Sequence, residues 1–382
     1  MDHVALKMLI GDRVRFLGMV FGLTFTAMLI TQQMSIFLGL MSRAYAAVTD
    51  IPAAQVWVMD PSMDTIDLGG ARGLSATAVD RVRAVPGVAW AVEHLRMPTE
   101  ATIFQASGGE RRDCLLIGVD DQSGIGLPRI VAGRIEDLRR DDAIFIDRDG
   151  LDKFARSGVT VRVGDTIEVN DHRAYVAGVV EAAVPVWFSP YLYTTATRAR
   201  SWLPPLRRDT TFVVARVVDG ADPAVVAAAI TRRTGLRAET TPVFTRMAAS
   251  HFATNTGIPI TFGTAVGLGF VVGTVIAGLL FFQFTRDNLR YFGALKAMGA
   301  SDGVLLRMVL LQAALVGLLG YGFGTGLAAL FGLVAGGSQL AWLLPPWLLG
   351  VTFLAISLIC LAAAALSIRT VIRLEPAVVF RG

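Results

Sequence analysis

Long stretches without charged side chains are the feature that most constrains the fold of this chain. No Asp, Glu, Lys or Arg occurs from Phe16 to Met41, and none occurs from Met308 to Ser367. A helix that crosses a bilayer needs about 20 mainly apolar residues. The second stretch is long enough for two such helices, and it is interrupted at residues 336–339 and by Pro345-Pro346. The sequence therefore predicts four membrane spans, at residues 16–41, 262–284, 304–334 and 347–366.

Basic residues beside these spans predict how the chain is oriented. Cytoplasmic segments next to membrane spans are enriched in Lys and Arg. Here such residues precede the first span, follow the second and follow the fourth: Lys7, Arg13, Arg15, Arg286, Arg290, Lys296, Arg369, Arg373 and Arg381. We therefore expect residues 1–15, 285–303 and 367–382 to face the cytoplasm, and residues 42–258 to lie outside it. The first span, at 26 residues, exceeds a signal-peptide core, which favours an uncleaved anchor.

The charge balance argues against a nucleic-acid partner. The whole chain has a formal net charge of +4, but residues 42–258 carry 25 basic and 26 acidic side chains. The positive excess therefore lies beside the spans. A nucleic-acid-binding domain concentrates basic residues on one face or stripe, and no such excess exists in the polar half of this chain.

The segment 42–258 is predicted to be an α/β domain with two subdomains. Residues 55–59, 76–85 and 88–92 read as strand, helix and strand, and residues 212–218, 224–234 and 237–241 repeat this order. Asp222-Pro223 and Gly235 are typical start and stop signals for the second helix. Two such units far apart indicate one subdomain, with a second inserted near residues 116–210. That insert contains a hairpin-like run at 161–169, followed by a strand at 173–180. The expected fold class is an α-helical membrane protein with four transmembrane helices and an inserted α/β extracytoplasmic domain.

The sequence contains no recognisable catalytic or metal site. A phosphate-binding loop requires a Gly-Lys pair, and none of the three lysines (Lys7, Lys153 and Lys296) follows a glycine. Gly299-Ala300-Ser301-Asp302-Gly303 fits the G-x-S-x-G nucleophile pattern. It lies in a short loop, however, and is better interpreted as a glycine that ends one helix and a serine that begins the next. The four histidines are scattered singly. We expect no enzymatic activity, no metal and no cofactor in this chain.

Pairs of glycines spaced four residues apart predict close helix packing within the membrane. This spacing lets two helix backbones approach each other, and it occurs at Gly263/Gly267 and at Gly320/Gly324. Packing among the four helices of one chain and dimerisation of two chains are both consistent with the pattern.

The short segment between the second and third spans is the main candidate functional site. Residues 286–299 are expected to form a helix with Leu289, Phe292, Leu295 and Met298 along one face. Such a face either rests on the membrane surface, held also by basic residues, or docks into another protein. The pattern alone leaves both interpretations open.

Three stretches of the sequence resemble the FtsX/MacB-like ABC transporter permeases, most closely their DevC-type branch. Residues 289–301 resemble the family's coupling segment R-E-I-G-x-L-K-A-L-G-A-S, with matches at Gly293, Leu295, Lys296, Ala297, Gly299, Ala300 and Ser301. Residues 373–381 resemble the family's basic C-terminal ending, and residues 56–61 with 163–168 resemble its outer domain. One departure is that Tyr291-Phe292 replaces the usual Glu-Ile.

The resemblance implies a function and a set of partners. It implies a MacB-like periplasmic core domain and a homodimeric permease subunit in the bacterial inner membrane. A separate ABC ATPase would bind ATP, and a periplasmic adaptor and an outer-membrane channel would complete an exporter that works by mechanotransmission. The residues implied to couple to the ATPase are Leu289, Arg290, Phe292, Gly293, Leu295, Lys296, Met298 and Gly299. Alternatives are a regulator of periplasmic enzymes such as cell-wall hydrolases, a lipoprotein-release type permease and, less favoured, a membrane-anchored enzyme.

Overall fold

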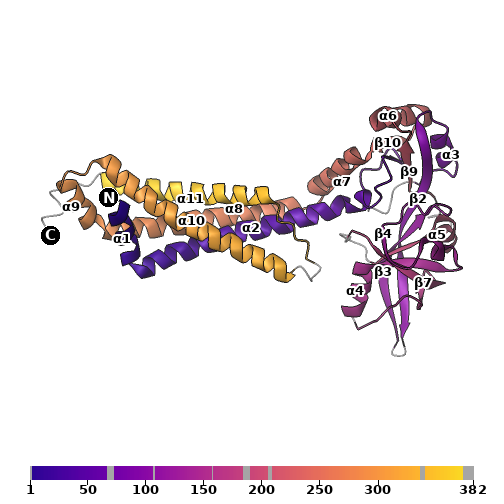
Figure 1. The fold of residues 1–382 in the computed structure, drawn as a ribbon, viewed down its shortest axis with the longest axis horizontal. Coiled ribbons are helices and arrows are strands. Elements are labelled where there is room, and N and C mark those ends of the chain that lie inside the picture. The colour runs from indigo at the N-terminus through magenta and orange to yellow at the C-terminus, as the bar shows by residue number, and fades with distance from the viewer. Residues whose placement is uncertain are drawn as a thin grey trace. The chain divides into compact units, whose positions relative to one another are not determined.

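The fold is described from a computed structural model (Figure 1). The structure describes residues 2–66, 73–105, 108–156, 158–183, 190–204, 209–335 and 340–372. The chain divides into two compact units. A helical unit contains residues 1–40 and 257–382, and an α/β domain contains residues 41–256.

The helical unit contains the four long apolar helices. Its helices are α1 (Asp2–Gly11), α2 (Arg13–Thr49), α8 (Ile258–Asp287), α9 (Leu289–Ala297), α10 (Asp302–Ala335) and α11 (Pro346–Ile372). Among the described residues, α2, α8, α10 and α11 are long and apolar enough to cross a membrane, which confirms the expected architecture. The interruption at 336–339 and the C-terminal motif at 373–381 lie outside the described residues.

Two boundaries in this unit differ from the expectation. Helix α2 continues past residue 41 to Thr49, because residues 42–49 contain no glycine or proline and Pro52 is the first helix breaker. The segment before the first span is also helical. Its residues Ala5 and Leu9 are fully buried in the apolar core.

The core of the helical unit is one apolar cluster to which all six helices contribute. Its fully buried members include Leu9, Met19, Leu23, Phe281, Phe284, Phe292, Met308, Val316 and Ile359. Large apolar side chains also cover the outside of the helices, for example Phe21 at 73% exposure and Leu333 at 79%. Such an exterior is unfavourable in water but is solvated by lipid tails.

The α/β domain is built on one sheet, of which the structure describes ten strands. They are β1 (Val56–Met59), β2 (Val88–Gln105), β3 (Gly108–Val119), β4 (Arg129–Ala132), β5 (Ala143–Asp147), β6 (Thr166–Val169), β7 (His172–Glu181), β8 (Tyr191–Thr195), β9 (Phe212–Val217) and β10 (Arg237–Thr240). The order is β10-β1-β9-β2-β3-β8-β5-β7-β4, with β6 paired to β2 and β7. The helices are α3 (Ala78–Arg83), α4 (Arg148–Arg156), α5 (Ala196–Trp202), α6 (Pro223–Thr234) and α7 (Thr241–Asn255), with a short 3-10 helix at Ile135–Arg139.

The first subdomain follows the predicted strand–helix–strand pattern. Strands β1, β9 and β10 and the start of β2 form its sheet, and α3 and α6 share an apolar cluster with these strands. The Asp222 side chain accepts a hydrogen bond from the Ala224 N–H at 2.9 Å, and Gly235 ends α6 in the left-handed conformation at φ = 69°. The start and stop signals of α6 are therefore confirmed.

The second subdomain begins earlier than residue 116. Strand β2 pairs with β9 as far as His94 and with β3 from Leu95 onward, so one long strand belongs to both subdomains. The hairpin-like run at 161–169 contains one strand, β6, rather than two. The hairpin instead joins β6 to β7 through Asn170 and Asp171, which both have positive φ. Two such residues form the tight turn that a two-residue hairpin requires, and Val161 packs in the core outside the strands.

Candidate functional site

Helix α9 is set off from α8 and α10 by well-formed helix ends. Asn288 separates α8 from α9, and its side-chain amide donates to the Phe284 carbonyl at 2.8 Å. At the other end, Gly299 has φ = 95°, its N–H donates to Lys296 O, and the Ala300 N–H donates to Leu295 O. This pattern is a Schellman motif, which requires a residue such as glycine in the left-handed region. The predicted helix-ending role of Gly299 is confirmed.

The predicted apolar face of α9 is split between the interior and the surface. Phe292 and Leu295 are only 1% and 8% exposed, and they pack in the same cluster as Leu9 of α1, Phe284 of α8 and Leu305 of α10. Gly293 is also buried. The periodicity correctly predicted an apolar face, but most of that face is covered by the chain's own helices.

The remaining surface of α9, together with Met298 directly after it, is exposed. Tyr291 is 63% and Met298 74% exposed, and Arg290 and Ala297 are exposed as well. At 100° per residue these four positions lie on one side of the helix. We call them the α9 outer face. Leu289 is half-buried, and Lys296 lies with its Nζ 3.0 Å from Asp302 Oδ1 at the start of α10.

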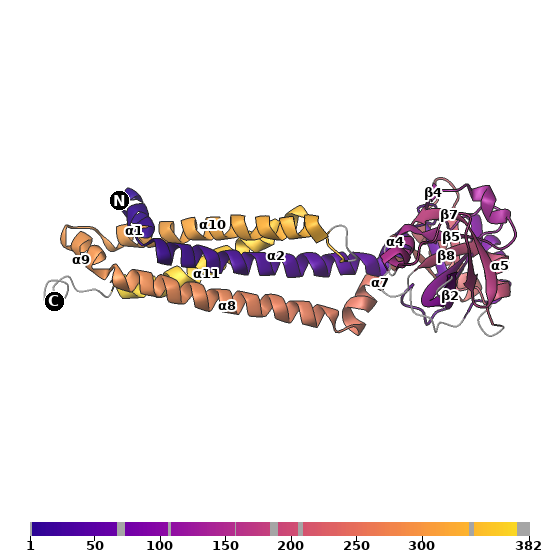
Figure 2. The ribbon, with the colours of Figure 1, turned by 90° about the horizontal axis from the view of Figure 1, so that it is seen from below.

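Polar contacts attach α1 to α10 at the end of the helical unit that also carries α9 (Figure 2). The buried Gln312 amide donates to the Ala5 carbonyl at 2.8 Å, and Arg307 of α10 pairs with Asp2 at 2.7 Å. Arg15, at the start of α2, pairs with Asp287 at the end of α8. Phe292 and Leu295 of α9 pack in one apolar cluster with residues of α1, α8 and α10, so a displacement of α9 would be passed on to these helices through that packing.

The two glycine pairs have different surroundings. A Cβ atom added to Gly320 would lie 2.5 Å from Leu23 Cβ, and one added to Gly324 would lie 2.5 Å from the Thr24 carbonyl oxygen. This pair therefore packs against α2 within one chain. Gly263 and Gly267 of α8 have no described neighbour within 4 Å of such an atom. Only this second pair is open to lipid or to a second copy of the chain.

The end of α2 and helix α7 meet the sheet of the α/β domain at one aromatic cluster. Trp57 of β1 contacts Phe212 of β9 and Phe244 of α7, with ring centroids 5.5 and 5.6 Å apart. Val48 and Ile51, at the end of α2, pack in the same cluster. We call Val48, Ile51, Trp57, Phe212 and Phe244 the base cluster. It joins the two helices that enter and leave the domain to a single sheet.

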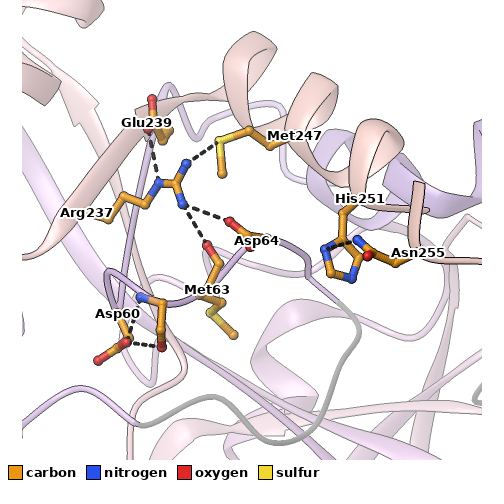
Figure 3. Close-up of polar contacts among 9 residues, drawn as sticks. Asp60, Met63, Asp64, Arg237, Glu239, Met247, His251 and Asn255 are labelled. Atoms are coloured by element: carbon orange, nitrogen blue, oxygen red, sulfur yellow. Dashed lines mark hydrogen bonds and ion pairs between the residues drawn. The ribbon is translucent and has the colours of Figure 1, made fainter. Parts of the chain in front are cut away.

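Arg237 reinforces the attachment of α7 (Figure 3). Its guanidinium donates to Asp64 Oδ1 at 2.9 Å, to Glu239 Oε1 at 3.2 Å, to the Met63 carbonyl and to the sulfur of Met247 in α7. One side chain thus links the segment after β1, strand β10 and α7. The sequence did not indicate this role, because Arg237 and Asp64 are 173 positions apart.

His94 of β2 is buried beside the base cluster. Its ring lies edge-on to Trp57 at 5.8 Å, and neither ring nitrogen has a hydrogen-bond partner among the described residues. Burial, together with the positive charge of Arg96, lowers the pKa of His94 to about 3. Asp147, also fully buried, accepts hydrogen bonds from the N–H groups of Tyr191 and Gly150, and burial raises its pKa to about 7.

We predict that His94→Leu changes the pH dependence of stability in the acid range. Unfolded histidine titrates near pH 6.5, so between pH 6.5 and 3 the unfolded chain binds a proton that folded His94 cannot. The contribution of His94 to the free energy of unfolding of the parent therefore falls on acidification. Asp147 binds its proton more readily in the folded chain, so its protonation raises the free energy of unfolding instead. The free energy of unfolding of the variant, relative to that of the parent, should therefore rise by about 1.4 kcal/mol for each pH unit of acidification below 6.5. Denaturant unfolding of the full chain in detergent, followed by tryptophan fluorescence, measures this difference. If the difference between variant and parent does not change with pH, as for the control His172→Leu at an exposed position, the prediction is wrong.

Among the described residues, no three His, Cys, Asp or Glu side chains lie close enough to hold a metal ion. Of the described cysteines, Cys114 and Cys360 are both buried. Burial raises the pKa of Cys114, the cysteine of the α/β domain. What the structure does provide is a short helix, α9, packed on a bundle of apolar helices, and a separate α/β domain. These features define a membrane protein with an inserted α/β domain.

Comparison with protein-family models assigns this membrane protein to a family. Residues 16–233 match the model of the MacB-like periplasmic core domain, and residues 263–376 match that of the FtsX-like permease C-terminal domain. The first match alone spans more than half of the chain. The chain therefore belongs to the FtsX/MacB-like family of ABC transporter permeases.

Solved structures with a similar domain are distant in sequence. The extracellular domain of the noncanonic ABC-type transporter YknZ from Gram-positive bacteria shares 16% identity, covers 49% of this chain and 98% of that chain, and has a TM-score of 0.35. The periplasmic region of MacB from Actinobacillus actinomycetemcomitans shares 12% identity, with coverages of 52% and 94% and a TM-score of 0.39. A search of curated proteins finds no match.

Proposed function

We propose that this chain is the membrane subunit of an ABC exporter, acting by mechanotransmission and powered by a separate ATPase subunit. The observation that carries the proposal is the two-sided character of α9. Phe292 and Leu295 fix the helix in the core of the bundle, while the α9 outer face remains exposed. A partner that binds and moves this outer face would move the bundle with it. Hydrolysis itself belongs to the partner, because the chain has no Gly-Lys pair to hold phosphates.

The coupling role is proposed for two groups of residues. Arg290 and Met298 on the outer face, with half-buried Leu289, would contact the ATPase, and Tyr291 would join them in place of the family's usual glutamate. Phe292, Gly293, Leu295, Lys296 and Gly299 would instead anchor the helix and define its ends. This division keeps every residue that the family resemblance implied, but assigns each a role according to its burial.

The proposed location is the inner membrane of a bacterium with both termini in the cytoplasm. Lys7, Arg13, Arg286 and Arg290 are all exposed, and they flank the same ends of the helices that carry α1 and α9. Such a concentration of basic side chains favours the cytoplasmic side. The α/β domain would then lie in the periplasm.

We also propose a homodimer of the permease and a DevC-type exporter with a periplasmic adaptor and an outer-membrane channel. The open Gly263/Gly267 side of α8 supports the dimer, because small residues without a neighbour in their own chain allow a second helix to approach closely. The adaptor and the channel rest on the family resemblance.

Co-purification tests this function. The full-length chain, extracted in mild detergent, should retain an ABC ATPase whose hydrolysis it stimulates, whereas the purified chain alone should hydrolyse no ATP. An adaptor in the same complex supports export. A cell-wall hydrolase would point to a regulator, and a lipoprotein carrier to a lipoprotein-release permease. If no ATPase is retained, or if the chain alone hydrolyses ATP, the proposal is wrong.

A further inference from the structure

A cleft lies between the two subdomains of the α/β domain. One wall is the β2 segment from Val88 to Glu93, with Arg83 beside it, and the other wall is the segment from Asp120 to Ile125 after β3. The cleft has a volume of about 730 Å³. Since one wall belongs to the first subdomain and the other to the second, the width of the cleft depends on the angle between them.

Strand β2 is the main covalent path across this boundary. It changes partner from β9 to β3 between His94 and Leu95. Just beyond this point, the Thr211 hydroxyl accepts a hydrogen bond from the Arg96 N–H at 3.0 Å and lies 3.2 Å from the Arg96 carbonyl oxygen. A single continuous strand can twist or bend where its partners change, so the angle also depends on contacts between the subdomains. One is the ion pair of Glu93 in the cleft wall with Arg200 of α5.

Asp50 supplies such a contact. It directly follows α2, and its Oδ2 accepts a hydrogen bond from the N–H of Ala183, just after β7 in the second subdomain, at 2.8 Å. The guanidinium of buried Arg96 acts on it electrostatically and also lies over the Tyr191 ring of β8, 5.3 Å from its centroid. Burial raises the pKa of Asp50, while the Ala183 hydrogen bond and the Arg96 charge lower it.

The neighbours of Asp50 in the sequence contact the other subdomain. Val48, Ile51 and Ala54 pack in the cluster that contains Trp57 and Phe212 of the first subdomain. The end of α2 is therefore attached to the first subdomain by apolar contacts and to the second through the carboxylate of Asp50. Asp50 and Ala183 are 133 positions apart, so this link closes a long loop of the chain.

We propose that Asp50 is a positioning residue that helps to fix the angle between the two subdomains and thereby the width of the cleft between β2 and residues 120–125. The link connects the end of a membrane-entering helix to a cleft in the α/β domain. The inference does not depend on the ATPase, because it concerns contacts within this chain.

Distance measurements on the full-length chain in nanodiscs test this proposal. Spin labels at the exposed positions Ala89 and Gln122 lie on opposite walls of the cleft, and Cys114 and Cys360 are buried, which limits background labelling. The parent should give one narrow distance distribution. Asp50→Ala should broaden it and shift its mean, because both the Ala183 hydrogen bond and the charge facing Arg96 are lost. Asp50→Asn keeps an acceptor oxygen for Ala183 but removes the charge, and should give a smaller change.

Asp219→Ala is the matched control, since its carboxylate is fully exposed on the first subdomain. This control should leave the distribution unchanged. A parent-like distribution in Asp50→Ala overturns the proposal, as does an equal change in the control. If Asp50→Ala does not fold, Asp50→Asn decides: a broadened distribution supports the role of Asp50, and an unchanged one overturns it. Co-purification of the ATPase, measured on the same samples, reports separately on the proposed function.

Discussion

Gly324→Leu should prevent the helical unit from assembling. A Cβ atom at this position would lie 2.5 Å from the Thr24 carbonyl oxygen, 2.6 Å from Ala27 Cβ and 2.8 Å from the Met28 nitrogen. Two of these are backbone atoms of α2, which cannot rotate away as a side chain can, so α10 and α2 would have to separate. Their packing is not replaced by contact with lipid, because close packing drives helix association in membranes. We expect a chain that inserts in the membrane but gives no monodisperse peak in detergent.

Two neighbouring glycines provide the control for this prediction. Gly322 and Gly326 lie on the same helix, yet an added Cβ would meet no described atom within 4 Å at either position. Gly322→Leu and Gly326→Leu should therefore express and purify like the parent. Size-exclusion chromatography and thermal unfolding of the three variants, purified in parallel, make the comparison. Equal behaviour of all three would contradict the α2–α10 packing described here.

These glycines also show what sequence patterns can and cannot predict. The spacing at Gly263/Gly267 is the same as that at Gly320/Gly324, but only the second pair packs against another helix of the chain. Spacing along a helix indicates that a close approach is possible, whereas the identity of the approaching helix depends on tertiary structure. The four spans and α6 were predicted well because their signals are local: uncharged length for the spans, and Asp222, Pro223 and Gly235 for α6.

The parts that sequence could not predict are mainly contacts between distant segments. Arg237 meets Asp64, and Asp50 meets Ala183, only because the sheet brings β1, β7 and β10 into one domain. The start of the second subdomain was misplaced for a related reason. A strand that changes partner at Leu95 shows no break in its own sequence. Likewise, the apolar spacing of α9 predicted a face without showing that α1, α8 and α10 cover it.

Phe292→Ala and Tyr291→Ala should affect different properties, although the residues are adjacent: the first should lower stability and the second should weaken ATPase binding. Phe292 is 1% exposed within the bundle core, so its truncation leaves a cavity and should destabilise the helical unit by about 3–5 kcal/mol. Thermal unfolding of the purified permease would show this loss in the absence of any ATPase. Tyr291 is 63% exposed, and its truncation should leave unfolding unchanged.

Measuring ATPase binding further distinguishes the role of Tyr291 from that of Phe292. If the α9 outer face docks in the ATPase, Tyr291 is its large aromatic anchor, and such anchors contribute about 2 kcal/mol or more when buried in an interface. Tyr291→Ala should then weaken ATPase binding by roughly 30-fold and abolish most of the stimulation of hydrolysis. Met298→Ala, on the same face, should have a smaller effect in the same direction.

Phe292→Leu completes the test, because it keeps an apolar side chain in the core while removing the aromatic ring. If the role of Phe292 is internal packing, this variant should regain most of the stability that Phe292→Ala loses, and should bind the ATPase nearly as the parent does. If Phe292 instead docks directly into the ATPase, Phe292→Leu should fold normally but bind weakly, and Tyr291→Ala should bind normally. Titration of the reconstituted permease with its ATPase distinguishes these two patterns. The burial of Phe292 against α1, α8 and α10 makes the first pattern the expected one, with force entering the bundle through Tyr291 and Met298 and passing inward through Phe292 and Leu295.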